Sequence, residues 1–164
     1  MLELRLASRE HAELIASIIQ EAYREQTELM KIDPRRYPTY AGFETADRVR
    51  LRLGTGDHAI LAYQDDEAVG TISYQIMPDR PQIGYIKRFG ILPQYRSHGY
   101  GKILVERVEH ELRALGATQA GISIIASSFR LQNYYEQMGY KVCERKSVPT
   151  LPFDVVYMDK AIGV

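Results

Sequence analysis

The chain has 164 residues, a length typical of one globular domain, and it is 45% hydrophobic and 26% charged. Lys and Arg together number 21, as do Asp and Glu, so no net charge favours binding to nucleic acid or to an anionic membrane. The single cysteine, the lack of a secretory-type N-terminus and the lack of an apolar run of ~20 residues predict a cytoplasmic protein without a membrane span, folded as one domain over residues 1–164.

The first half of the chain predicts strands and two helices. Residues 2–6 alternate apolar and polar side chains, which is typical of a half-buried strand. Ser8 is placed to cap a first helix, and Gly54 to end a second helix over residues 45–53. The apolar face of the first helix comprises Leu14, Ile15, Ile18, Ile19, Ala22 and Tyr23. Residues 58–63 and 68–77 predict a hairpin, and a further strand covers residues 83–92. Gly90 interrupts that strand, which indicates a bulge or the close approach of another backbone.

The second half alternates strands and helices. A helix after residue 99 ends at Gly116, and Ser127 or Ser128 caps another that runs to Gly139. The apolar face of the first of these two helices comprises Leu104, Val105, Val108, Leu112 and Leu115. Strands are predicted over residues 119–126, 140–144 and 153–158, and the strand–helix–strand order implies parallel pairing through a crossover. The sequence therefore predicts an α/β fold with a mixed, mostly antiparallel central sheet and helices on both faces.

The segment from Ile91 to Lys102 combines a strand end, a polar loop with two glycines and a helix start. Glycines let backbone N–H groups turn toward one point, and a helix N-terminus adds unpaired donors, so this geometry suits an anionic oxygen. The nucleoside-triphosphate loop is excluded because Ile103 follows Gly101-Lys102 where that code needs Ser or Thr. The dinucleotide code is excluded because Leu104 stands where a third glycine is needed.

The segment Arg96-Ser97-His98-Gly99-Tyr100-Gly101, preceded by Ile91-Leu92-Pro93, resembles the pyrophosphate-binding motif of the GNAT acyltransferases. A second motif follows in the expected order, because Tyr135 and Gly139-Tyr140 match the family's Tyr-x-x-x-Gly-aromatic pattern. Two separated motifs with a strand between them are more specific than either motif alone. The resemblance is close over residues 83–142, and it implies the GNAT fold for the whole chain.

By this resemblance the chain binds acetyl-CoA as co-substrate and needs no metal. Backbone amides of the loop would hold the pyrophosphate, and the pantetheine arm would pair with the strand that ends at Ile91. The N–H of Gly90 or Ile91 would polarise the thioester carbonyl. The residues that the resemblance assigns to the cofactor are Gly90, Ile91, Arg96, Ser97, His98, Gly99, Tyr100, Gly101, Lys102 and Ser128.

The implied reaction is direct attack of an amine on the thioester carbon, with Tyr135 as the acid that protonates the leaving thiolate. Many family members carry a Glu as base on the strand before the loop, whereas this stretch reads Ile86-Lys87-Arg88-Phe89. The base is therefore open: Glu28, Asp33 and Glu44 are candidates, and a water chain is the alternative.

The acceptor site is expected, by family analogy, over residues 21–43. Its carboxylates and tyrosines suit a cationic amine, whereas Arg35 and Arg36 suit an acceptor that carries a carboxylate. The favoured function is an N-acetyltransferase acting on a primary amine of a small molecule or a peptide. A non-catalytic acyl-CoA-binding or sensing module is the alternative, and a homodimer is expected by analogy alone.

Overall fold

The computed structural model describes residues 1–163, and within them the strands form one seven-stranded sheet with the order β1-β2-β3-β4-β5-β7-β6. The strands are β1 (Leu2–Leu6), β2 (His58–Gln64), β3 (Glu67–Met77), β4 (Arg80–Ile91), β5 (Gln119–Ile125), β6 (Lys141–Ser147) and β7 (Asp154–Ala161). All neighbouring strands are antiparallel except β4 and β5, which are parallel. The predicted mixed, mostly antiparallel sheet is confirmed.

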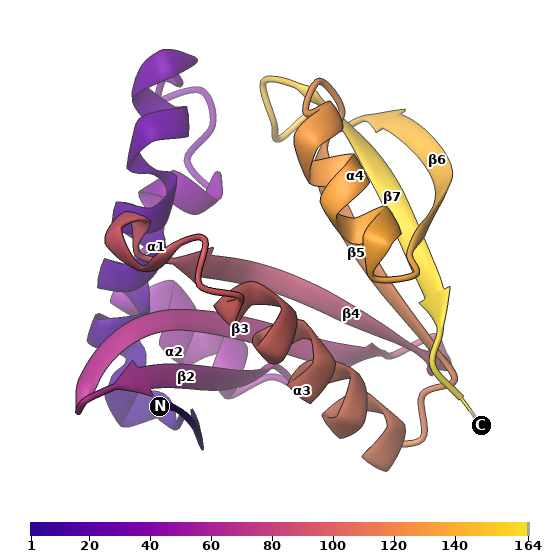
Figure 1. The fold of residues 1–164 in the computed structure, drawn as a ribbon. Coiled ribbons are helices and arrows are strands. Elements are labelled where there is room, and N and C mark those ends of the chain that lie inside the picture. Colours follow the sequence, from indigo (N-terminus) through magenta and orange to yellow (C-terminus); the bar gives the residue numbers. More distant parts are fainter. Residues whose placement is uncertain (164) are drawn as a thin grey trace.

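Four α-helices within the described residues cover both faces of this sheet (Figure 1). They are α1 (Ala12–Leu29), α2 (Ala46–Leu53), α3 (Tyr100–Ala114) and α4 (Phe129–Gln137). Short 3-10 turns lie at Arg9–His11, Ala41–Phe43 and Pro93–Tyr95. Figure 1 shows α3 in front of β2 and β3, with α1 and α2 behind the same strands and α4 in front of β5 and β7.

The alternation of side chains along β2 divides the core into two clusters. Ile60 and Ala62 pack with α3 and α4, whereas Ala59 and Leu61 pack with α1 and α2. Successive residues of a strand point to opposite faces, so a strand covered on both faces must be apolar at nearly every position. This accounts for the continuous apolar run of β2.

The parallel pairing of β4 and β5 is short, and the two strands then separate. Their register covers only three pairs, from Ile83 opposite Gln119 to Tyr85 opposite Gly121. A Cβ at Gly84 would lie 2.4 Å from the Leu112 side chain, so α3 packs directly on β4 where the two strands still pair. Beyond that point β4 stays with β3 and β5 stays with β7, which gives the divergence visible in Figure 1.

Several sequence predictions need correction in detail. Leu14 and Leu115 were expected on buried helix faces, but their side chains are 37% and 47% exposed. Leu115 is the C-cap of α3, one residue beyond the last helical turn, where the periodicity no longer applies. The strand predicted at 140–144 extends to Ser147, and the last strand runs from Asp154 to Ala161 rather than from 153 to 158.

A search of residues 1–163 finds no helix that combines the length and the apolar character needed to cross a membrane.

Candidate active site between the diverging strands

The end of β4 is distorted immediately before Gly90. Thr71 pairs with Gly90 and Ser73 with Lys87, so Arg88 and Phe89 together oppose Ile72 and form a bulge. Arg88 adopts a left-handed conformation with φ of 48°. The bulge therefore precedes Gly90. The sequence also offered the close approach of another backbone as the reason for Gly90. Helix α1 does approach closely, because a Cβ at Gly90 would lie 2.8 Å from the Ala22 Cβ.

Beyond the bulge, the backbone of β4 presents a donor to the opening. The Leu92 N–H donates to the Val69 oxygen at 2.9 Å, which fixes the pairing with β3. Since N–H groups alternate between the two edges of a strand, the Ile91 N–H faces away from β3, on the side from which β5 has diverged, and the Gly90 N–H faces β3. Of the two predicted carbonyl-polarising amides, Ile91 is the one directed to the opening.

The loop that follows has the backbone of an anion site. Ser97 and Gly99 both adopt left-handed conformations, with φ of 66° and 79°, and Gly99 is the N-cap of α3 without a side-chain hydrogen bond. Amides in such a sequence converge, and the first amides of α3 have no side-chain cap, so they are available to an anionic ligand. Ser97, His98 and Gly99 are exposed, as is Lys102, whose ammonium lies 3.8 Å from Glu106.

The other loop side chains are engaged with the protein. His98 stacks on Tyr100 with ring centroids 5.5 Å apart, and its Nδ1 lies 2.8 Å from the Arg96 oxygen. The Tyr100 hydroxyl donates to the side chain of Gln64 on β2. The Arg96 guanidinium is bonded to two backbone carbonyls. The loop thus offers chiefly backbone groups, and the binding of phosphate by its amides stays a prediction.

Tyr135 lies on α4, whose ring cluster fills the space beside the opening. Its side chain is only 4% exposed, and its ring meets the rings of Tyr134 and Tyr140 edge-on at 5.2 and 5.9 Å. Burial, with smaller contributions from Tyr23 and Tyr134, raises the pKa of Tyr135 far above its usual value, so the phenol keeps its proton at neutral pH. No fully enclosed side-chain oxygen or nitrogen in residues 1–163 lacks a hydrogen-bond partner. The Tyr135 hydroxyl, which bonds to no described residue, therefore borders solvent-accessible space.

Comparisons with known proteins agree with this arrangement. The profile of the Acetyltransferase (GNAT) family matches residues 16–140, which is more than half of the chain. The chain belongs to the GNAT family.

Individual relatives are more distant. A candidate acetyltransferase of Bacillus subtilis strain 168 is 30% identical over 89 residues, so the match spans 53% of this chain and only 55% of that protein. The structure of PaiA N-acetyltransferase from Thermoplasma acidophilum, determined with coenzyme A, superposes with a TM-score of 0.75 at 18% identity and covers 98% of this chain and 99% of that one. The ribosomal-protein-S18-alanine N-acetyltransferase of Escherichia coli gives 0.77 at 15% identity, covering 100% and 96%. At such identities the structural likeness shows the fold.

Against this GNAT framework, the structure places two further sequence candidates. Ser128, rather than Ser127, is the N-cap of α4, and its hydroxyl accepts from the Leu131 N–H at 3.2 Å. The Ser128 hydroxyl oxygen is thus occupied by the N-terminal cap of α4. Tyr134, which the sequence assigned to packing, lies over the start of α3, because a Cβ at Gly101 would fall 2.2 Å from its hydroxyl. The pair of adjacent tyrosines was the available sequence signal for this contact.

The three carboxylates named as candidate bases have different surroundings. Glu44 is buried and forms ion pairs with Arg52 and with Arg88, whose Nε lies 3.1 Å away. Asp33 accepts from the Arg35 N–H at 2.9 Å in an exposed turn, and Glu28 is exposed on α1. Residues 1–163 contain no group of three or more His, Cys, Asp or Glu side chains that could hold a metal ion.

The connection between α1 and α2 contacts the loop between β6 and β7. Tyr40 is buried, accepts a hydrogen bond from Gln26 at 2.7 Å and packs edge-on against Phe43 and Phe153. Phe153 belongs to the β6–β7 loop, so two segments far apart in sequence meet beside β4. The first of these segments belongs to residues 21–43, the region that the family analogy assigns to the acceptor.

Proposed function

We propose that the chain is an N-acetyltransferase that transfers an acetyl group from acetyl-CoA to a primary amine of a small molecule or a peptide by direct attack. One observation carries this proposal: β4 and β5 part after three residue pairs, with a backbone anion site at one side of the opening and the protonated phenol of Tyr135 at its wall. Membership of the GNAT family supports the acetyltransferase class.

The backbone supplies the cofactor contacts in this proposal. Amides of the segment from Arg96 to Gly101 hold the pyrophosphate, because the two left-handed residues and the uncapped helix start direct donors outward. The pantetheine arm lies along the edge of β4 that faces away from β3, and the Ile91 N–H polarises the thioester carbonyl. Ser128 lies at the start of α4, where a contact to the arm requires its hydroxyl to share the capping bond.

Tyr135 supplies a proton to the leaving group. The amine nitrogen bonds to the thioester carbon, the carbon–sulfur bond breaks, and the sulfur takes up the phenolic proton or shares it in a hydrogen bond. Because burial raises the pKa of Tyr135, the phenol is protonated at pH 7 and can act as a donor in every turnover.

The amine must also lose a proton, and water is the best-supported acceptor for it. Glu44 is held by two arginines and Asp57 by Lys87 at 2.9 Å, so neither carboxylate is a free base at the opening. Bulk water at the exposed face of β5, where Ser123 is exposed, can relay that proton. The neighbours named as N-acetyltransferases, one of them for a protein alanine, support an amine as acceptor.

The test is a panel of small amines and peptides scored by release of free thiol from acetyl-CoA. We expect at least one acceptor to be acetylated on nitrogen, with product mass increased by one acetyl group. Hydrolysis of acetyl-CoA without acceptor acetylation, across the whole panel, would contradict the proposal.

Glu44 and Asp57 are held in ion pairs, so neither is free to act as a catalytic base. This observation favours a second candidate function, a non-catalytic acyl-CoA-binding module. This candidate predicts tight binding of acetyl-CoA without turnover for every amine. A homodimer, a cytoplasmic location and a single domain over the whole chain stay predictions, to be checked by light scattering, fractionation and limited proteolysis.

A further inference from the structure

Arg96, the basic residue of the loop, connects two elements of the fold. Its Nη2–H donates to the Ala22 oxygen at 2.7 Å, and its Nε–H donates to the Ile91 oxygen at 3.2 Å. Ala22 lies on α1 and Ile91 ends β4. The guanidinium thus bridges a helix and a strand through two neutral carbonyls, although a free arginine beside a phosphate site would be expected to direct its donors to the anion.

These two bonds belong to a pattern along the open edge of β4. The Tyr23 hydroxyl, one residue after Ala22, donates to the Phe89 oxygen at 3.0 Å. Two successive edge carbonyls, those of Phe89 and Ile91, are therefore each occupied by a side-chain donor. The Ile91 N–H lies between them and, by the alternation along the strand, faces the same open edge. This edge of β4 therefore presents an N–H donor, while the two neighbouring carbonyl acceptors are already bonded to side chains. Such an edge suits a ligand carbonyl oxygen, which needs a donor.

Close packing fixes the same junction. A Cβ on Gly90 would lie 2.8 Å from the Ala22 Cβ, so α1 touches the backbone of β4 at the residue between the two capped carbonyls. The contact fixes the distance between helix and strand. The bonds from Tyr23 and Arg96 fix how far the strand is rotated about its axis, and hence the direction of the Ile91 N–H.

We propose that Arg96 is a positioning residue rather than a ligand of the cofactor phosphates: it holds the Ile91 peptide against α1 so that the Ile91 N–H faces the thioester carbonyl. The identity of that carbonyl rests on the proposed acetyltransferase function. Without the side chain, the Ile91 oxygen is unpaired beside the reacting carbonyl, and the end of β4 is free to rotate. A misplacement of about 1 Å at a reacting centre costs on the order of a hundredfold in rate.

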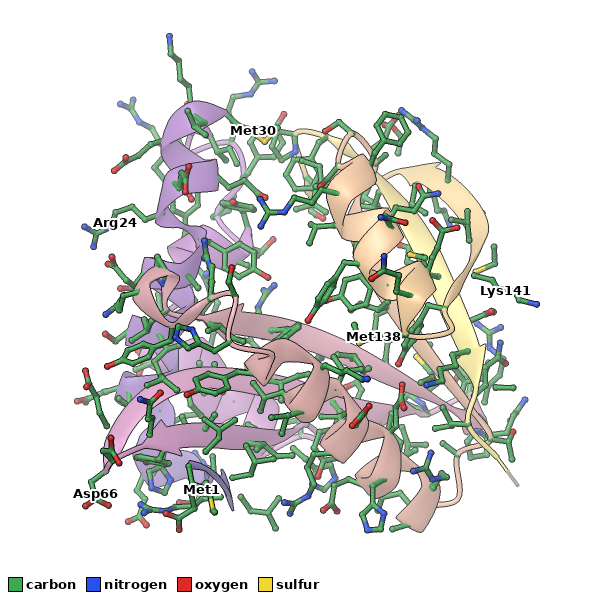
Figure 2. The ribbon with its side chains drawn as sticks, in the orientation of Figure 1. Met1, Arg24, Met30, Asp66, Met138 and Lys141 are labelled. Carbon is green, nitrogen blue, oxygen red and sulfur yellow. The ribbon has the colours of Figure 1, made fainter. Side chains whose placement is uncertain are left out.

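The test compares Arg96→Ala and Arg96→Lys with Lys141→Ala, which removes an exposed basic side chain that Figure 2 shows pointing outward from β6, outside residues 21–43. Two quantities are measured: kcat for the best amine of the panel, and Kd for the nucleotide diphosphate half of coenzyme A, without the pantetheine arm, at low and high salt. For Arg96→Ala we expect kcat to fall about 10- to 100-fold, with Kd and its salt dependence unchanged. Arg96→Lys, which can reach one of the two carbonyls, should recover part of kcat.

A loss of affinity for the nucleotide half, with a weaker salt dependence, would make Arg96 a phosphate ligand and overturn the proposal. Unchanged kcat in Arg96→Ala would overturn it as well. If the wild type transfers no acetyl group at all, the proposed function fails separately, and amide hydrogen exchange then decides about Arg96. Faster exchange at residues 89–92 in Arg96→Ala, but not in Lys141→Ala, supports the positioning role, and equal exchange in both variants overturns it.

Discussion

Tyr134 and Tyr135 are neighbours in the chain, but their surroundings differ. The Tyr135 side chain is 4% exposed and the Tyr134 side chain 37%. Consecutive residues of a helix point about 100° apart, so one ring enters the core while the other reaches over the start of α3. Burial raises the pKa of both phenols. The two side chains differ in what they contact: the Tyr134 hydroxyl lies against Gly101, whereas the Tyr135 ring packs edge-on against the Tyr140 ring.

We predict that Tyr135→Phe lowers kcat about 100- to 10,000-fold while the affinity for acetyl-CoA changes little, because the variant loses only the proton donor. Stopped-flow thiol release and calorimetry would measure the two quantities. Tyr74→Phe is the matched control, since Tyr74 is a buried tyrosine of β3 outside the site, and its loss should leave kcat unchanged. Equal kcat in the wild type and Tyr135→Phe would exclude the acid role.

A second prediction for single residues follows from the contact between Tyr134 and Gly101. Gly101→Ala places a methyl 2.2 Å from the Tyr134 hydroxyl, whereas the ring carbon that bears it lies at 3.4 Å. We expect Gly101→Ala to destabilise the protein by about 1–3 kcal/mol and Tyr134→Phe to relieve most of that cost in the double variant. Urea unfolding of the four proteins measures the coupling. Additive effects would show that the clash lies elsewhere.

At the scale of elements, α3 is tied to the C-terminal strands by one buried carboxylate. Glu109 is 4% exposed and accepts from the Tyr140 hydroxyl at 2.8 Å and from the Lys160 ammonium at 3.0 and 3.1 Å. Tyr140 follows α4 and Lys160 lies on β7. Because β4 and β5 share only three pairs, this tie also holds the C-terminal strands against α3, and so sets the opening.

We therefore predict that Glu109→Ala costs about 3–5 kcal/mol in the free energy of unfolding, since it leaves a partly buried ammonium without its counter-ion. Glu106→Ala on the same helix removes an exposed carboxylate 3.8 Å from Lys102 and should cost below about 0.5 kcal/mol. Urea unfolding of the wild type and the two variants would measure both losses of stability. Similar losses in both variants would mean that the Glu109 pair contributes no more than a surface pair.

For the whole molecule, the many buried tyrosines predict a loss of stability at high pH. Burial raises the pKa of Tyr74 and of Tyr85 to about 12, and that of Tyr140 still further. Tyrosine in an unfolded chain titrates near ~10, so above that pH the unfolded state has released protons that the folded state retains. The free energy of unfolding should therefore fall as the pH rises from about 10 toward about 12.

Urea midpoints at stepped pH, together with the ultraviolet absorbance of tyrosinate, would check this. Tyr85→Phe removes one of the shifted groups and should make the decline shallower. A decline of the same slope in that variant would show that Tyr85 ionises alike in the folded and the unfolded protein.

Most helices and strands could be predicted from local sequence patterns, because the apolar periodicity of an element is set by its own residues. Alternation predicted β1, two strand-like runs predicted the β2–β3 hairpin, and the glycines at 116 and 139, both with positive φ, marked helix ends. The 3-10 turn before α1 was not predicted, and the bulge expected at Gly90 lies just before it, at Arg88 and Phe89. The hydrogen-bond partners of the Arg96 side chain were not predicted either, since Ala22 lies 74 positions away in sequence.

The sequence by itself determined the order of the elements, the family resemblance and the loop that suits an anion, because glycine spacing and periodicity are local properties. Only the tertiary structure decided which side chains are free to react. It placed Glu44 between Arg52 and Arg88, bound Arg96 to two carbonyls and buried the Tyr135 side chain. The reason is physical: the availability of a charge, a carbonyl or a phenol depends on partners that folding brings from distant parts of the chain.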